Sequence, residues 1–216
     1  MNIIRSIIIS ILLMPQIVFT QKNINVGFQT GFNLSTISLI KIPASISPRM
    51  GYMVGLLTEI RISENISIQP ELLYTEKGAE GASDYGTIHD GYYYSRPVEF
   101  TWIINYISIP INLEVRFASI NETNFYVFAG PNISFRLLSE VEKTIDFKTS
   151  TSPTENCEPI DYSLDLGTGF EQRIGHATMF FVNLRYSHGI NDINKDANES
   201  WKTRSFQLLA GIKFSL

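Results

Sequence analysis

The sequence has little of what would tie it to a disulfide-rich, nucleic-acid-binding or helical membrane protein. It contains one cysteine, Cys157, so a disulfide within the chain is excluded. Lysine and arginine are scattered over a chain of formal charge -4, and no basic patch predicts a nucleic-acid partner. Beyond the N-terminus there is no run of about twenty apolar residues, the length that a membrane-spanning helix needs. If the chain enters a membrane, it does so as β-strands.

The N-terminal segment, residues 1–20, is predicted to be a signal peptide. Arg5 supplies the positive charge, and the short apolar run that follows is interrupted by a proline too early to form a spanning helix. Small or short side chains precede a predicted cut between Thr20 and Gln21. The sequence therefore predicts export through the Sec pathway and one mature domain, residues 21–216.

The stretch N-Y-I-S-I-P-I-N-L-E-V-R-F, residues 105–117, alternates apolar and polar side chains. In an extended strand, Ile109 and Leu113 fall on one face and Glu114 and Arg116 on the other, because successive side chains point to opposite sides. One apolar face and one ionic face are typical of a small transmembrane barrel. The alternative is a soluble lipid-binding barrel of the lipocalin type, which would place the apolar face inside and the ionic face outside.

Other segments repeat this alternation and predict eight strands, at residues 24–34, 51–62, 66–75, 105–117, 125–137, 161–171, 180–187 and 206–214. The segments between them alternate long and short, and the long ones are residues 35–49, 78–97, 138–160 and 189–202. Long external loops and short periplasmic turns are the rule in outer-membrane barrels. We predict an all-β fold: an eight-stranded antiparallel up-and-down transmembrane β-barrel with long external loops and short periplasmic turns.

Charged residues of both signs fall on the predicted inward face. A narrow barrel has room for side chains and little else, and an unpaired buried charge costs several kcal/mol. We therefore expect a salt-bridge network that fills the lumen as a structural plug; the alternatives are a proton or ion path and a catalytic carboxylate pair. Its predicted members are Glu59, Arg61, Glu71, Glu114, Arg116, Arg136, Asp165, Glu171, Arg185 and Lys213.

Three prolines interrupt the strand patterns, and aromatic residues cluster near the predicted strand ends. Because proline cannot donate to a sheet ladder, we expect a bulge or altered register at Pro70, Pro110 and Pro131.

Aromatic side chains such as Tyr106 and Trp201 are expected at the membrane interfaces.

No catalytic or cofactor site is predicted. Ser187 and His188 are adjacent, as a lipid-modifying barrel enzyme would need, but neighbouring strand residues point to opposite faces. His89 and His176 lie in separate loops, and no metal-ligand spacing occurs. We expect a chain that is not an enzyme and needs no cofactor or metal.

Several motifs resemble the PorT-like outer-membrane β-barrel family of Bacteroidota. They are G-F-N-L-S (31–35), I-Q-P-E-L-L-Y-T-E-K-G-A (68–79), N-Y-I-S-I-P-I-N-L (105–113), F-Y-V-F-A-G-P (125–131), D-Y-S-L-D-L-G-T-G-F-E (161–171), L-R-Y-S-H-G-I-N-D-I (184–193) and F-Q-L-L-A-G-I-K-F (206–214). The resemblance spans almost the whole mature chain and implies an outer-membrane location, without implying catalysis.

The expected function is that of a small, non-enzymatic outer-membrane barrel with a structural or surface-contact role. The alternative is an accessory outer-membrane component of a type IX-like protein secretion system. Expected partners are outer-membrane lipid and lipopolysaccharide, the barrel-assembly machinery during insertion, and a surface or secretion-system protein.

Overall fold

The computed structural model describes residues 24–40, 45–89, 92–154, 157–195 and 200–216. The predicted signal peptide and its cleavage site lie outside the described residues. The strands are β1 (Ile24–Ile40), β2 (Ser45–Arg61), β3 (Ile66–His89), β4 (Tyr92–Ile120), β5 (Thr123–Ile145), β6 (Lys148–Pro153), β7 (Ile160–Arg173), β8 (Thr178–Gly189) and β9 (Ser200–Ser215). Among the described residues, no helix is long and apolar enough to cross a membrane.

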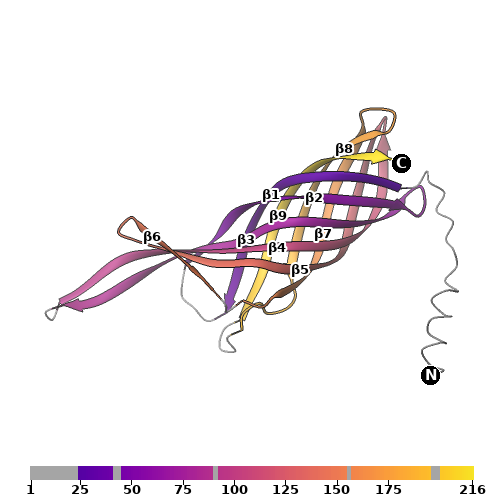
Figure 1. Cartoon of the computed structure of the whole chain (residues 1–216). Helices are drawn as coiled ribbons and strands as arrows, with labels where there is room; N and C mark the ends of the chain where they lie inside the picture. Colours follow the sequence, from indigo (N-terminus) through magenta and orange to yellow (C-terminus); the bar gives the residue numbers. More distant parts are fainter. Residues whose placement is uncertain (1–23, 41–44, 90–91, 155–156, 196–199) are drawn as a thin grey trace, which may run out of the picture.

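The sheet closes on itself. Nine strands follow the order β4-β3-β2-β1-β9-β8-β7-β5-β6, and β4 also pairs with β5, so eight of them form a ring with β6 outside it. The first and last strands meet along their whole length, from Asn25 opposite Ser215 to Ile40 opposite Ser200. All pairs are antiparallel, and strands of the ring pair with their neighbours along the chain (Figure 1). The predicted eight-stranded up-and-down barrel is confirmed.

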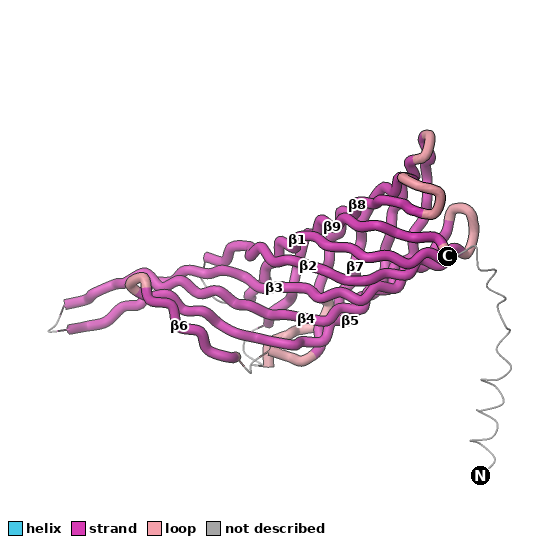
Figure 2. The backbone as a smooth tube through the Cα atoms, turned by 45° about the horizontal axis from the view of Figure 1, so that its top comes forward, coloured by secondary structure: helices cyan, strands magenta, loops and turns pink. Residues whose placement is uncertain are grey.

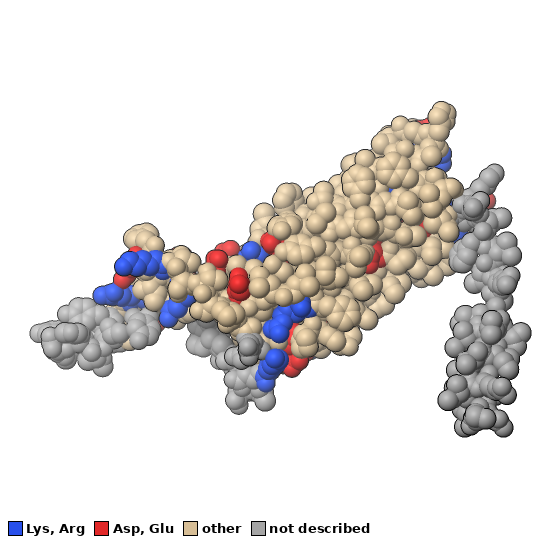
Figure 3. All heavy atoms as spheres, viewed as in Figure 1, with Lys and Arg blue, Asp and Glu red and all other residues tan. Residues whose placement is uncertain are grey.

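The faces of the wall have the predicted orientation. On β4, Leu113 and Phe117 are 49% and 64% exposed, whereas Glu114 and Arg116 between them are buried. Figure 3 shows the same pattern on one side of the molecule, where few charges lie on the barrel wall. More charges lie toward the end that carries the long segments between strands, which we call the long end. The lipocalin alternative is therefore wrong, because the ionic groups are enclosed and the apolar ones face outward.

The long segments gather at one end, but much of their length is sheet. The sequence predicts a loop over residues 78–97, whereas β3 continues to His89 and β4 begins at Tyr92, with the two strands paired. The segment 138–160 likewise contains the end of β5 and the short strand β6. Figures 1 and 2 show these strands extending beyond the barrel, at the end opposite the C-terminus. The loop prediction is wrong here because strand pairing needs no apolar face once the strands leave the wall.

The three prolines do not change the register. Pro70 faces Ile111 and Leu73 faces Ser108, which is the same register on both sides of the interruption. Pro110 in turn faces Asn132, the residue after Pro131. The pairing is interrupted beside the prolines, at residues 71–72 of β3 and 111–112 of β4, and resumes in the same register, so no bulge forms there.

Register shifts occur elsewhere in the wall. They lie between Pro48 and Met53 in the β2–β3 pair, and between Asn105 and Tyr106 and between Arg116 and Ala118 in the β4–β5 pair. Near the prolines, the wall is instead tightened by Gly130, where an added Cβ would lie 2.0 Å from the carbonyl oxygen of Ile111. No side chain larger than hydrogen fits between β4 and β5 at that position.

A charge placed on the outer wall tests the orientation of the sheet. Leu113 lies in the middle of the outward apolar row of β4, so Leu113→Arg should lower the free energy of unfolding by about 2–4 kcal/mol. The control is Phe147→Arg in the fully exposed turn between β5 and β6, where we expect a change within about 0.5 kcal/mol. Urea unfolding of both variants in phospholipid vesicles measures the difference. Equal effects would mean that Leu113 does not face hydrocarbon.

Candidate functional site

The lumen at the short-turn end holds the first group of buried charges, which we call the Glu59 layer. Lys213 on β9 reaches Glu59 on β2 at 3.2 Å and Glu171 on β7 at 3.6 Å. Arg116 on β4 pairs with Glu59 and places its Nε atom 3.1 Å from Glu171. Arg61 completes the group through Glu59 at 3.1 Å. Side chains from four strands therefore converge on one alternating set of charges, in which each member has at least one ion pair of opposite sign.

The remaining carboxylate of this layer, Glu114, has weaker partners. Its nearest cation is Lys213 at 3.8 Å, and the hydroxyl of Ser67 donates to it at 3.3 Å. The Lys213 ammonium also lies 5.1 Å from the ring centre of Phe181, within the range of a cation–π contact. Lys213 is thus the common partner of three buried acids.

A second group, the Glu71 layer, fills the middle of the barrel. The Nη2 atom of Arg185 lies 2.7 and 2.9 Å from the two oxygens of Glu71, and its Nη1 atom lies 3.5 Å from Asp165. The amide of Asn112 donates to Glu71 at 3.0 Å, and the hydroxyl of Ser187 donates to Asp165 at 2.6 Å. One guanidinium therefore bridges carboxylates on β3 and β7 across the lumen. Neutral side chains donate further hydrogen bonds to the same carboxylates.

A third group, the Lys77 layer, lies nearer the long end and is missing from the predicted set. The Lys77 ammonium contacts Asp161 at 2.9 Å, and the hydroxyl of Thr203 donates to the same carboxylate at 2.9 Å. The predicted third strand stopped at Thr75, although the alternation continues through Lys77. Following the period of two beyond the apolar region would have found this residue.

The structure places Arg136 apart from the other predicted members. It is half-buried on β5, and its Nη1 atom has no hydrogen-bond partner among the described residues. Its backbone N–H donates to the carbonyl of Pro159 at 2.9 Å, so it lies where the wall meets the segment before β7. Each of the other predicted members has at least one ion pair in the lumen.

An apolar cap, residues 157–159 and 190–195, covers the three layers at the long end. Its side chains Cys157 and Ile193 are fully buried against Ile37, Ile104 and Tyr106 of the wall. Backbone bonds hold its two segments together: the N–H of Glu158 donates to the carbonyl of Ile193 at 2.7 Å. Tyr106 is therefore inside the barrel, and its expected place at the membrane interface is wrong.

Asp192 orders the turn that carries Ile193. Its carboxylate accepts the backbone N–H groups of Asn194 at 2.9 Å and Trp201 at 2.8 Å. Burial acts to raise the pKa of Asp192, but these donors outweigh it and hold the pKa below its usual range. A lowered pKa means that the carboxylate stabilises the turn at neutral pH and loses this effect only as the pH falls through that lowered value.

The cap can be tested through the thiol of Cys157. In the folded protein a maleimide should modify it at least tenfold more slowly than in urea, because the side chain is fully enclosed. Ile193→Asp should open the cap and restore fast modification at a rate close to that of the unfolded chain. The control is Ile190→Asp, since Ile190 is 58% exposed. Fast labelling of the unaltered protein would contradict the buried position.

These observations define a class of protein: a small outer-membrane β-barrel with a lumen filled by side chains. The chain belongs to the outer membrane protein beta-barrel domain family, whose model matches residues 16–195. The outer membrane is accordingly its location.

Several solved structures are similar to this chain at low identity. Ail, the attachment invasion locus protein of Yersinia pestis, is 12% identical with a TM-score of 0.44, over 88% of this chain and 98% of that one. Neisserial surface protein A is 15% identical with a TM-score of 0.46, over 88% and 97%. The outer membrane protease OmpT of Escherichia coli is 9% identical with a TM-score of 0.41, over 94% and 99%. No curated protein sequence matches the chain.

Proposed function

We propose that the protein is a non-enzymatic barrel with a closed lumen, which displays a β-sheet extension for contact at the cell surface. The observation that carries this proposal is the filling of the barrel. Three charged layers and an apolar cap follow one another from the short turns to the long end. Such a lumen serves to hold the wall rigid, since its ionic groups are engaged with one another.

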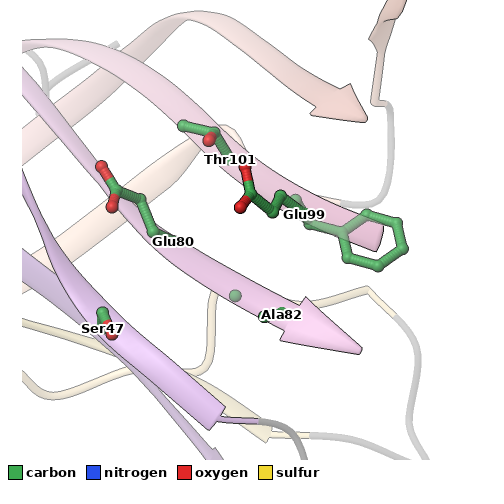
Figure 4. A pocket seen from close by; sticks show the side chains of 7 residues that line it. Ser47, Glu80, Ala82, Glu99 and Thr101 are labelled. Atoms are coloured by element: carbon green, nitrogen blue, oxygen red, sulfur yellow. The ribbon is translucent and has the colours of Figure 1, made fainter. Parts of the chain in front are cut away.

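The extension supplies the contact surface. β3 and β4 continue beyond the wall as a long hairpin, and β6 adds an outer strand with all its residues exposed. At the base of the hairpin is a polar groove of about 240 Å³, around which Ser47, Glu80, Glu99 and Thr101 lie (Figure 4). An ordered sheet presents such side chains at a lower entropic cost of binding than a flexible loop would.

The placement of the serine and histidine pair supports a role without catalysis. Ser187 points into the lumen and donates to Asp165, whereas His188 lies on the outer face with its Nδ1 atom 3.3 Å from the hydroxyl of Tyr186. A hydrolase needs the base within hydrogen-bond reach of the nucleophile. No group of three metal-binding side chains occurs in the part of the chain that the structure describes.

Single-channel recording in planar bilayers tests the closed lumen. We expect no conductance steps from the purified protein. A variant with Lys77→Ala and Ile193→Ala should begin to conduct, because it removes side chains from both the Lys77 layer and the apolar cap above it. Regular steps from the unaltered protein would overturn the closed lumen.

The surface role is tested by replacing residues 84–97 with a two-residue Asn-Gly turn, which keeps the pairing of Ser83 with Val98. This variant should keep the heat-dependent gel mobility of a folded barrel but lose its cross-links to neighbouring surface proteins on intact cells. Cross-links that persist in the trimmed barrel would contradict the proposed contact surface. Cross-links to a component of a secretion system would assign the contact to the accessory role that the PorT-like resemblance suggests.

A further inference from the structure

The outer wall has a groove of about 490 Å³ near the long end of the barrel, at the junction of β8, β9, β1 and β2. Its lining includes Leu34, Thr36, Pro48, Tyr186, Arg204 and Phe206. The groove is on the face that meets the membrane, not on the lumen side that carries the charged layers.

The floor of the groove is a row of apolar side chains across three strands. Phe206 on β9 lies opposite Leu34 on β1 and opposite Tyr186 on β8. The rings of Tyr186 and Phe206 have centres 4.9 Å apart, while Phe206 and Leu34 are 59% and 43% exposed. A hydrocarbon chain lying on this row would cover apolar surface that the protein itself leaves open.

The next row toward the long end is cationic. Arg204 is exposed and lies opposite Thr36 on β1 and His188 on β8, and Lys202 follows on the same face of β9. No ion pair to Arg204 occurs within the described residues, and none of the residues paired with it is acidic. The outward face thus changes from apolar to basic within two residues of β9, between Phe206 and Arg204.

We propose that this groove binds a phosphorylated membrane lipid, with an acyl chain along Leu34 and Phe206 and the phosphate on Arg204. A planar guanidinium donates two parallel hydrogen bonds to a phosphate, and it is less strongly hydrated than an ammonium. The height at which the wall changes from apolar to basic is where a lipid changes from chain to headgroup. Charge complementarity therefore selects an anionic lipid, and the apolar floor selects one with chains.

Binding is measured by native mass spectrometry of the full-length folded protein in detergent, with phosphatidic acid as the probe. Diacylglycerol with the same chains and inorganic phosphate are the two comparison ligands. We expect saturable binding of one phosphatidic acid and much weaker binding of either comparison ligand, because each supplies only half of the contact.

Arg204→Gln should weaken the binding of phosphatidic acid about tenfold, the usual effect of losing a hydrogen bond to a charged group. The matched control is Arg173→Gln, which removes an exposed arginine at the short-turn end and should leave the affinity unchanged. Phe206→Asn should weaken phosphatidic acid binding by removing the apolar floor. Heat-dependent gel mobility verifies that each variant is folded.

Three results would overturn the proposal. Equal weakening by Arg204→Gln and Arg173→Gln would indicate diffuse attraction to any positive charge. Equal binding of diacylglycerol would indicate a chain contact without a phosphate site, and equal binding of inorganic phosphate would indicate an ordinary anion contact without a lipid.

Discussion

Replacing Lys213 by methionine is expected to destabilise the folded barrel by about 3–5 kcal/mol, the usual cost of removing one partner from a buried ion pair. The side chain is fully buried and lies within 4 Å of Glu59, Glu114 and Glu171. Methionine has a similar length but carries no charge, so each of the three carboxylates loses one ion-pair partner. Glu114 is affected most, because Lys213 is its closest cation.

The measurement is urea unfolding of the refolded protein in phospholipid vesicles, followed by tryptophan fluorescence. The control is Lys148→Met on β6, where the side chain is exposed and the same substitution should change stability by less than about 0.5 kcal/mol. A second variant, Lys213→Arg, retains the charge and should recover part of the loss. A loss below 1 kcal/mol for Lys213→Met would mean that the Glu59 layer contributes little to stability.

Arg185→Met is expected to have an effect of similar size, about 3–5 kcal/mol, because it also removes the cation of buried ion pairs. Arg185 is the cation that contacts both Glu71 and Asp165, and it connects β8 to acids on β3 and β7. Without it, the two carboxylates face each other across a narrow lumen with only neutral donors such as Asn112 and Ser187. Removal of the guanidinium therefore leaves negative charge enclosed by the wall.

A double-mutant cycle separates this pair from general packing. Glu71→Gln in the Arg185→Met background should restore about 0.5–3 kcal/mol, because it removes one of the two uncompensated charges. The measurement is again the free energy of unfolding in vesicles. If the losses from the single substitutions simply add in the double variant, Arg185 and Glu71 do not stabilise the fold through each other.

The wall could be predicted from the sequence because its physical constraint is strict. Lipid on one side and a narrow lumen on the other force each residue to be apolar or polar in turn, so the direction of Leu113 and Glu114 follows from alternation alone. The same reasoning identified most of the charged lumen, including Arg185, Glu71 and Lys213. The strands beyond the wall were not predicted, because successive exposed side chains such as those of Ala82, Ser83 and Asp84 show no period of two.

The cap could not be predicted for a related reason. Cys157 and Ile193 lie in segments without regular alternation, and they meet only because the ends of β7 and β8 bring those segments over the lumen. The prolines show the opposite case, where a local rule predicts three bulges that the structure does not contain. The pairing is only interrupted beside Pro70 and Pro110 and resumes in the same register, which a linear sequence does not display.

Because β1 pairs with β9, the barrel cannot close until the C-terminal strand β9 is present. Until Ser200–Ser215 has been synthesised, β1 and β8 each retain a bare edge with unsatisfied N–H and C=O groups, which hydrocarbon does not tolerate. Insertion of a closed ring must therefore wait until β9 is available. A tag fused directly after Leu216 is expected to interfere at this seam, whereas an affinity sequence placed in the turn after β5 would leave it untouched.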